Sequence, residues 1–231
     1  MGTSPRSASF FAQVSQDLMR IAEERPTLQT VVERAVEVVP ACEWASVTLR
    51  RRRNRTETVA ASSDVAREAD ELQYELDEGP CLEAVETGEP RLSNHLADSH
   101  DWPRWGPRAA KIGVNALLGI QLSTDDEVLG ALNLYAGTAG AFTRDDIDVA
   151  EIYVTHATNA LTAARISTGL RTALHSRHMI GVAQGILMHT YDLSLDQSFE
   201  LLRRYSSHTN TRLTEVAEHV VQHRALPENE G

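Results

Sequence analysis

Apolar positions in the first forty residues recur at steps of three and four, the spacing that places side chains on one face of an α-helix. This spacing predicts helical structure over residues 8–39. Pro26 interrupts the pattern, and Thr27 is a suitable cap for a second helix that ends at Pro40. The apolar positions are Phe11, Val14, Leu18 and Ile21 in the first helix and Leu28, Val31, Val32, Ala35 and Val38 in the second.

From Trp44 the period changes to two, because Ser46 and Thr48 alternate with Val47 and Leu49. This alternation predicts a strand with one apolar face and one polar face. A turn rich in arginine follows, and the chain then returns as a second strand.

The remaining elements of this half of the chain alternate between short helices and strands. Because strands do not alternate regularly with long helices, a parallel doubly wound sheet is disfavoured. We predict an α+β fold with one antiparallel sheet and flanking helices. The predicted elements are a basic turn at 50–55, a strand at 56–60, helices at 64–74 and 81–87, an irregular stretch at 91–107, and a hairpin of strands at 116–122 and 128–135.

A helical pattern with heptad spacing runs from Thr143 to residue 189, and Thr143 with Asp146 has the spacing of a capping box. Such a helix is roughly 70 Å long at 1.5 Å per residue. That length cannot be buried in a monomer of 231 residues. We therefore predict a parallel homodimer through the long helix. Its expected seam is Ile152, His156, Asn159, Ala163, Ile166, Leu170, Ala173, Arg177, Ile180, Gln184 and Leu187.

Gly169 lies in the middle of this helix, where it could introduce a kink, and we place the domain boundary in this region. The expected domains are residues 8–165 and residues 166–226. The first helix of the second domain continues the last helix of the first.

The C-terminal segment is expected to form a compact bundle of three helices. Ser194 and Gln197 have capping-box spacing at the start of the second helix, and the polar residues 206–210 resemble a turn before the last helix. Gly181 and Gly185 form a GxxxG pattern, which outside a membrane favours close approach of two helices.

The formal net charge is -11, from 33 acidic and 22 basic residues, and it is unevenly distributed. Residues 1–169 carry a net charge of -10, whereas residues 170–225 carry six arginines, five carboxylates and six of the nine histidines. An acidic protein repels polyanions at long range. The C-terminal segment is therefore the region expected to accept one.

The sequence contains no Gly-rich phosphate loop, no histidine pair at metal spacing and no nucleophile elbow. Cys42 and Cys81 stand apart, as expected of buried thiols rather than of a zinc or redox pair. The apolar runs fall far short of the roughly 20 residues that span a bilayer, and the start lacks the features of a signal peptide. We expect a cytoplasmic protein with no enzymatic activity, cofactor, metal or membrane partner.

Three segments near the C-terminal end resemble the ANTAR domain. They contain A-x-G-I-L-M within residues 177–188, S-x-x-x-x-F-x-x-L-R within 194–206 and N-x-R-L-x-x-V-A at 210–217. The resemblance implies an RNA-binding module of three helices that antiterminates transcription by holding paired hairpins in nascent RNA. Ser198 departs from the alanine usual in the family, and Gln184 replaces a basic residue of many members, which removes a possible phosphate contact.

Residues 10–165 resemble a GAF domain. The resemblance rests on E-G-P-C at 78–81, D-W-P-R-W at 101–105 and G-A-L-N-L-Y at 130–135. It implies a sensor of a small-molecule or redox signal, with a pocket beside an antiparallel sheet.

Trp102, Trp105 and Cys81 are the candidate residues of that pocket. The two tryptophans lie in a Pro- and Gly-rich segment, so they are suited to a pocket wall or lid. The alternative is that they form a structural plug at the sheet edge. Cys81 lacks the sequence context of a chromophore attachment site, and the sequence identifies no ligand.

Arginine, asparagine and serine side chains gather around the turn between the last two helices. RNA loops are read by stacking and hydrogen bonding, and RNA duplexes by shape and phosphate contacts. The start of the last helix also offers free N–H groups to a phosphate, and Arg177 is a further candidate on the long helix. The alternative is an ordinary solvated helix surface. The candidate RNA-binding residues at the turn are Arg203, Arg204, Ser206, Ser207, Asn210 and Arg212.

These features predict a signal-responsive transcription antitermination regulator that binds hairpins in nascent RNA. The alternative is a ligand-responsive DNA-binding regulator, because three short helices also describe a helix-turn-helix. Glu215 and Glu218 lie on the candidate recognition helix, where they would repel DNA phosphates.

Overall fold

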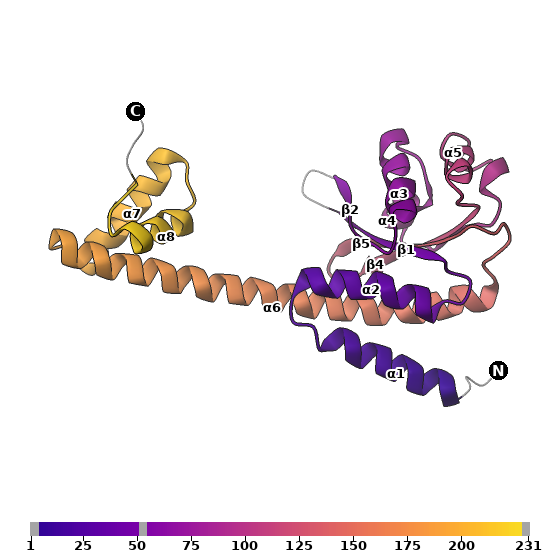
Figure 1. Cartoon of the computed structure of the whole chain (residues 1–231), viewed down its shortest axis with the longest axis horizontal. Helices are drawn as coiled ribbons and strands as arrows, with labels where there is room; N and C mark the ends of the chain where they lie inside the picture. The colour runs from indigo at the N-terminus through magenta and orange to yellow at the C-terminus, as the bar shows by residue number, and fades with distance from the viewer. Residues whose placement is uncertain (1–4, 51–54, 228–231) are drawn as a thin grey trace. The chain divides into compact units, whose positions relative to one another are not determined.

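The computed structural model describes residues 5–50 and 55–227, with side chains from residue 10 onward. The chain divides into two compact units, Met1–Ile166 (unit 1) and Ser167–Gly231 (unit 2). The long helix α6 (Arg144–Tyr191) contributes to both units (Figure 1). Among the described residues, no helix combines the length and apolar character needed to cross a membrane.

Unit 1 is built on one antiparallel sheet of five strands in the order β2-β1-β5-β4-β3. The predicted α+β fold with a single antiparallel sheet is therefore confirmed. The strands are β1 (Trp44–Arg50), β2 (Thr56–Ala61), β3 (Arg91–Ser93), β4 (Ala116–Ser123) and β5 (Val128–Ala136).

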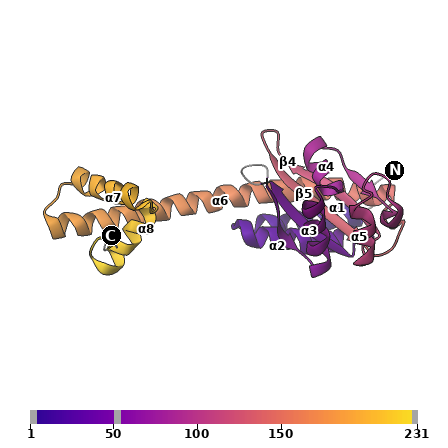
Figure 2. The same cartoon turned by 90° about the horizontal axis from the view of Figure 1, so that it is seen from above.

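Helices cover both faces of the sheet (Figure 1, Figure 2). Helix α2 and the first part of α6 cover one face, and α3, α4 and α5 cover the other, while α1 packs beneath α2. The helices of unit 1 that precede α6 are α1 (Pro5–Met19), α2 (Glu24–Val38), α3 (Asp64–Leu76), α4 (Pro80–Thr87) and α5 (Trp105–Lys111).

Alternate residues of each strand enter different cores, as the two-residue period of a strand requires. Val47 and Leu132, which are paired across β1 and β5, face α2 and α6. Leu117 and Tyr135 are paired across β4 and β5 and face α3 and α5. The sheet is thus the middle layer of three.

The predicted polar face of β1 is wrong in one respect, because it is not exposed to solvent. Ser46 and Thr48 are fully buried, and the exposed fractions of Val47 and Leu49 are 0% and 2%. The layer formed by α3 and α4 covers the strand face that the alternation had suggested would meet water.

The start of α2 also differs from the prediction. The helix begins at Glu24, so Pro26 occupies its first turn, where a backbone N–H has no intrahelical acceptor to lose. Thr27 is buried and does not cap the helix; its hydroxyl donates to the carbonyl of Glu23 at 2.7 Å. The predicted basic turn lies partly in residues 51–54, outside the described residues.

The stretch predicted to be irregular contains short elements. Arg91 and Leu92 of β3 pair with β4, a single 3-10 turn follows at Leu96–Asp98, and α5 begins at Trp105. Elements of three to seven residues contain too few positions for a helical or strand period to show.

Unit 2 comprises the C-terminal part of α6 with α7 (Leu195–Thr209) and α8 (Leu213–His223). The Ser194–Gln197 capping box is confirmed. The predicted turn at 206–210 is wrong, because α7 continues to Thr209 and only Asn210 adopts the left-handed conformation, with φ of 52°. The buried core is Ala183, Leu187, Leu202, Val216, Ala217 and Val220.

Helix α6 runs for 48 residues without a break at Gly169, and the Thr143–Asp146 capping box is confirmed. The predicted seam does not continue along its whole length. Ile166 and Leu170 are 67% and 61% exposed, whereas Leu187 is fully buried in the core of unit 2. Leu187 therefore cannot also face a second chain.

The close helix approach predicted at Gly181 and Gly185 does not occur within this chain. A Cβ atom added at either glycine would meet no atom within 4 Å apart from the helix's own neighbouring backbone. Both glycines lie on the side of α6 that faces away from α7 and α8.

Candidate nucleic-acid interface and sensor core

The turn between α7 and α8 is held by its own hydrogen bonds. The backbone N–H of Asn210 donates to the carbonyl of Ser206, and the Ser206 hydroxyl donates to the carbonyl of Thr211 at 2.6 Å. Ser206 therefore serves the turn itself rather than pointing at a ligand. Arg212 is the N-cap residue of α8, and no side chain caps the backbone N–H groups of that first turn.

The two adjacent arginines of α7 are in different electrostatic states. Arg203 donates to Glu200 at 2.6 and 3.1 Å, and these hydrogen bonds hold the pKa of the Glu200 carboxyl below its usual value. Arg204 has no ion-pair partner among the described residues. Both side chains are exposed, so Arg204 is the cation more readily available to an anion.

A shallow groove of about 510 Å³ lies over the outer face of α7. Three of the predicted RNA-binding residues line it together with one histidine. The lining residues are Arg203, Arg204, Ser207 and His208.

A second groove, of about 370 Å³, lies toward the start of α7 and shares Arg204 with the first. Two carboxylates on this side oppose the approach of a phosphate. The lining residues are Leu193, Asp196, Gln197, Glu200, Leu201 and Arg204.

The structure brings only some of the predicted site residues together. Arg203, Arg204 and Ser207 share the groove, while exposed Asn210 and Arg212 occupy the adjoining turn. Ser206 points into the turn, as described above. Arg177 is exposed on α6 and lines neither groove.

In unit 1, a buried carboxyl group lies between α3 and the sheet. Asp70 is fully buried and accepts hydrogen bonds from the Tyr135 hydroxyl, from Asn133 Nδ2 at 2.9 Å and from Thr58 Oγ1 at 2.7 Å. Burial raises the pKa of Asp70, and these donors oppose the rise only in part. The sequence prediction missed this group because a lone aspartate in an amphipathic helix resembles a solvated residue.

Further polar side chains of the sheet complete this cluster. The Tyr74 hydroxyl lies 2.6 Å from that of Thr48 and 2.9 Å from that of Thr58. Asn133 Nδ2 also donates to Ser46 and Thr48, while Asn133 Oδ1 is buried with no partner among the described residues. The polar residues of β1 therefore face a buried network in place of solvent.

Trp102 and Trp105 are 3% and 0% exposed and pack edge to face, with ring centroids 6.4 Å apart. Trp102 Nε1 donates to Glu83 at 2.9 Å, and Trp105 Nε1 donates to the carbonyl of Ala69 at 3.0 Å. Both indoles have the contacts of core side chains, which favours the structural plug over the predicted pocket wall or lid.

Cys81 is also a core residue, packed against Val85 and Ala131. Burial raises the pKa of both Cys81 and Cys42 to about 12. Because the thiolate is the reactive form of cysteine, neither group is suited to redox sensing at neutral pH. Within the described part of the chain, no three His, Cys, Asp or Glu side chains are grouped so that they could hold a metal.

Two segments that supported the GAF resemblance are in direct contact. Glu78 accepts from the backbone N–H groups of Arg104 and Trp105 at 2.7 and 2.8 Å and from Arg104 Nε at 2.7 Å. Burial acts to raise the pKa of Glu78, but these hydrogen bonds hold it below its usual value. Gly79 has a φ of 149°, and a Cβ there would overlap Gln73, whose Oε1 accepts from Cys81 N at 2.8 Å.

A family model of the GAF domain matches residues 22–162, and one of the ANTAR domain matches residues 168–221. The chain belongs to the GAF domain family and carries an ANTAR domain C-terminal to the GAF domain. The GAF domain contains the sheet and the Asp70 cluster, and the ANTAR domain contains the α7 groove.

Solved structures share the fold of the GAF domain at low sequence identity. The GAF domain of an Acinetobacter phosphoenolpyruvate-protein phosphotransferase has 12% identity and a TM-score of 0.55 over 71% of this chain and 97% of that one. The corresponding domain from Coxiella burnetii has 16% sequence identity and a TM-score of 0.55, over 71% of this chain and 96% of that one. The GAF domain of the cyanobacteriochrome TePixJ has 17% sequence identity and a TM-score of 0.52, over 64% of this chain and 95% of that one. No curated protein matches the chain.

Proposed function

We propose that the protein is a signal-responsive transcription antitermination regulator. Its ANTAR domain binds hairpins in nascent RNA, and its GAF domain responds to a small-molecule signal. The observation that carries this proposal is the α7 groove, which gathers Arg203, Arg204, Ser207 and His208 beside the turn within residues 170–225, a segment that carries six arginines and five carboxylates.

The side chains of the groove suit a folded RNA. Arginine pairs with phosphate through two N–H groups and also stacks on unpaired bases. Arg204 lacks an ion-pair partner among the described residues, and the uncapped N–H groups at the start of α8 favour a phosphate beside Arg212. Because the whole chain carries a net charge of -11, this local attraction has to exceed general repulsion, and binding should weaken steeply with salt.

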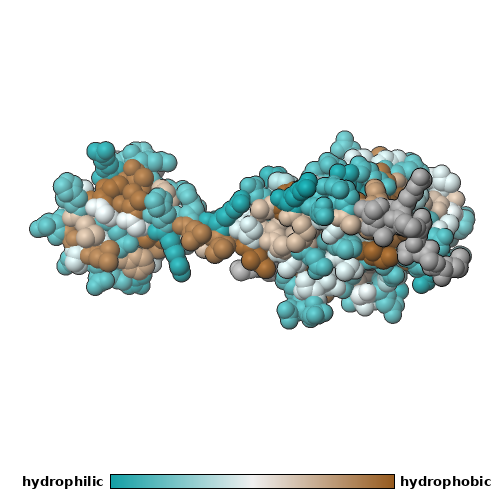
Figure 3. Space-filling model, turned by 90° about the horizontal axis from the view of Figure 1, so that it is seen from below, coloured by the Kyte–Doolittle hydropathy of each residue, from teal (hydrophilic) through white to brown (hydrophobic). Residues whose placement is uncertain are grey.

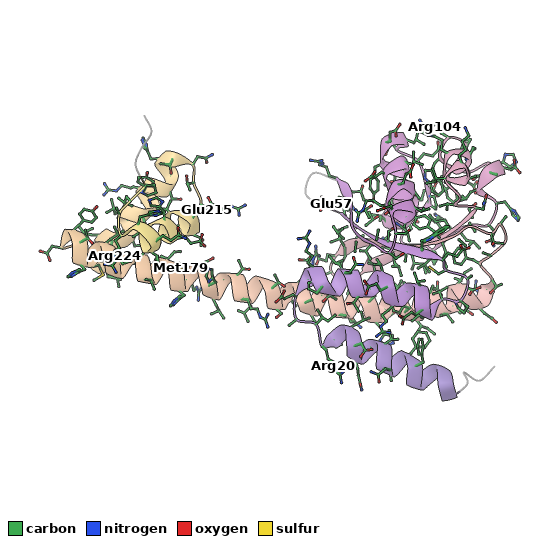
Figure 4. The ribbon with its side chains drawn as sticks, in the orientation of Figure 1. Arg20, Glu57, Arg104, Met179, Glu215 and Arg224 are labelled. Carbon is green, nitrogen blue, oxygen red and sulfur yellow. The ribbon has the colours of Figure 1, made fainter. Side chains whose placement is uncertain are left out.

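Reading of DNA by α8 has less support. Glu215, labelled in Figure 4, is exposed on that helix, and Glu218 lies 3.8 Å from His175. Two carboxylates on the helix that would enter a major groove would repel the flanking phosphates.

We further propose that the protein acts as a homodimer through α6. Apolar side chains stand exposed along the middle of this helix, as the space-filling view shows (Figure 3). Ile166, Leu170 and Leu174 are 67%, 61% and 57% exposed, at steps of four. Pairing with a second α6 would remove this surface from water, and the seam would end before Ile180 and Leu187, which pack inside the ANTAR domain.

We propose that the protein is cytoplasmic and that its role is regulatory rather than catalytic. Neither cysteine is suited to a thiol redox signal, which leaves a small molecule as the favoured input to the GAF domain.

The experiment that tests the proposal is sequencing of RNA that is recovered with the tagged, crosslinked protein from its own cells. Enrichment of transcript leaders with paired hairpins is the expected result. Recovery of genomic DNA fragments without RNA enrichment would contradict it.

A further inference from the structure

One flank of α7 carries both apolar and polar side chains. Steps of four, four and three place Leu195, Phe199, Arg203 and Ser206 along the same side of the helix, and Asn210 follows as its C-cap. We call this row the α7 flank. It adjoins the groove at Arg203.

The apolar half of the α7 flank is open to solvent. Phe199 is 38% exposed and Leu195 is 59% exposed, whereas the neighbouring Ser198 and Leu202 are fully buried. The core of the ANTAR domain is therefore formed by the next side of the helix, and the Phe199 ring is left at the surface beside Arg203.

Charge divides the α7 flank into two halves. Asp196 and Glu200 border its first half, and Glu200 is the partner of Arg203. A phosphate is repelled there and attracted toward the second half by Arg203 and, beyond the end of α7, by Arg212. The part of a nucleic acid that contacts Phe199 should therefore be uncharged. The bases are uncharged, whereas the phosphates are not.

The spacing suits a single nucleotide. Side chains four residues apart on a helix have Cβ atoms about 5–6 Å apart, a distance that the sugar of one nucleotide can span between its phosphate and its base. An aromatic ring stacks on any base, because every base has a π-face. Unpaired bases of this kind occur in the loops of RNA hairpins.

We propose that Phe199 is a stacking platform for an unpaired base of the RNA hairpin loop, while Arg203 exchanges its solvent-exposed pair with Glu200 for the adjoining phosphate. This inference rests on the proposed RNA binding by the ANTAR domain. It assigns the apolar half of the α7 flank to RNA rather than to a second protein chain.

The test uses the full-length protein and a synthetic RNA hairpin whose sequence is taken from the RNA that co-purifies with it, with one loop base replaced by fluorescent 2-aminopurine. Phe199→Leu keeps an apolar side chain but removes the ring, and Phe199→Trp keeps a ring. Phe10→Leu is the matched control, because Phe10 is 41% exposed on α1 of unit 1, outside the ANTAR domain. Circular dichroism verifies that each variant is folded.

We expect Phe199→Leu to weaken hairpin binding by about 5- to 100-fold, to abolish quenching of 2-aminopurine and to leave the salt dependence unchanged. Arg204→Ala should instead lower the salt slope by about one. Phe199→Trp should retain affinity and quenching, and it decides the matter if Phe199→Leu does not fold.

Two results would overturn the proposal. If Phe199→Leu binds and quenches as the unaltered protein does while Arg204→Ala is weakened, RNA binding stands but the base lies elsewhere. If Phe199→Leu instead changes the molar mass in light scattering without changing RNA affinity, the flank is a protein contact. Absence of hairpin binding by the unaltered protein is the separate outcome that removes the proposed function as well.

Discussion

The side-chain amide of Gln184 on α6 lies 3.5 Å from the hydroxyl of Ser198 on α7. The same amide donates to the carbonyl of Leu195 at 3.1 Å, and the Ser198 hydroxyl donates to that carbonyl at 2.7 Å. The two positions at which the sequence departs from the ANTAR pattern are therefore in contact. Gln184 therefore connects α6 to the start of α7.

Removal of this amide should loosen the start of α7. We expect Gln184→Ala to destabilise this region by about 1 kcal/mol, the usual value of one hydrogen bond, and to speed amide exchange in α7 roughly fivefold. Ser198→Ala should change stability by less than about 0.5 kcal/mol, because Gln184 keeps the Leu195 carbonyl as its acceptor. Hydrogen-exchange mass spectrometry of peptides from α7 measures both. Equal amide exchange rates of α7 in the two variants would show that the Gln184 amide does not stabilise the start of α7.

The two arginines of the groove should contribute unequally to RNA binding. Arg204→Ala removes a cation without an ion-pair partner among the described residues, so we expect weaker hairpin binding and a salt slope lower by about one. Arg203→Ala also leaves Glu200 unpaired beside the groove, so it should weaken binding further. Anisotropy titrations at several salt concentrations measure both effects.

Arg144→Ala is the matched control, because Arg144 forms a similar surface pair with Asp148 in the GAF domain. Its affinity and salt slope should equal those of the unaltered protein. Should it weaken binding as much as Arg204→Ala does, the effect comes from net charge and not from the groove.

The raised pKa of Asp70 predicts how the stability of the GAF domain depends on pH. A carboxyl whose pKa is higher in the folded than in the unfolded protein contributes stability at low pH, and that contribution is lost as the pH rises toward the folded pKa. Between the unfolded and the folded pKa of Asp70, the free energy of unfolding of the unaltered protein should fall relative to that of Asp70→Asn. The expected slope is up to about 1.4 kcal/mol per pH unit.

Urea unfolding between pH 4 and 8, followed by tryptophan fluorescence, measures this difference. All three tryptophans lie in the GAF domain, so the signal reports that domain alone. Asp125→Asn controls for the loss of a carboxylate at an exposed turn. A difference that stays flat, or that rises with pH in favour of the unaltered protein, contradicts the prediction.

The proposed dimer through α6 predicts a sharp response at Leu170, which is 61% exposed. Leu170→Asp places a charge in the seam and should convert a dimer into a monomer in light scattering at tens of micromolar. Thr172→Asp places the same charge on the opposite face of α6 and should leave the dimer intact. If the unaltered protein is monomeric in light scattering, the proposed dimer is contradicted.

Periodicity located the elements that are long enough to show a period. The hairpin of β4 and β5 and the helix beginning at Arg144 agree with the predicted ranges, because eight or more residues repeat one rule. The three residues of β3 cannot do so, and Gly181 shows a further limit. A glycine pair indicates that close packing is possible, but not whether the partner belongs to the same chain.

The candidate sites divided along a similar line. Arg203, Arg204 and Ser207 could be brought together from sequence because one helix carries all three. The Asp70 cluster could not, since Asn133 and Tyr135 lie more than sixty residues away and meet Asp70 only through the pairing of β1 with β5. Its strand members resemble, one by one, solvent-facing strand residues, and Asp70 resembles a solvated helix residue.

RNA binding and DNA binding are distinguished by a competition titration of the full-length protein with a hairpin RNA and with duplex DNA of the same stem sequence, at several salt concentrations. We expect the RNA to bind more tightly at every salt concentration, and Arg204→Ala to reduce the salt slope for RNA by about one. DNA binding equal to or tighter than RNA binding, with the slope unaffected by Arg204→Ala, would contradict this expectation.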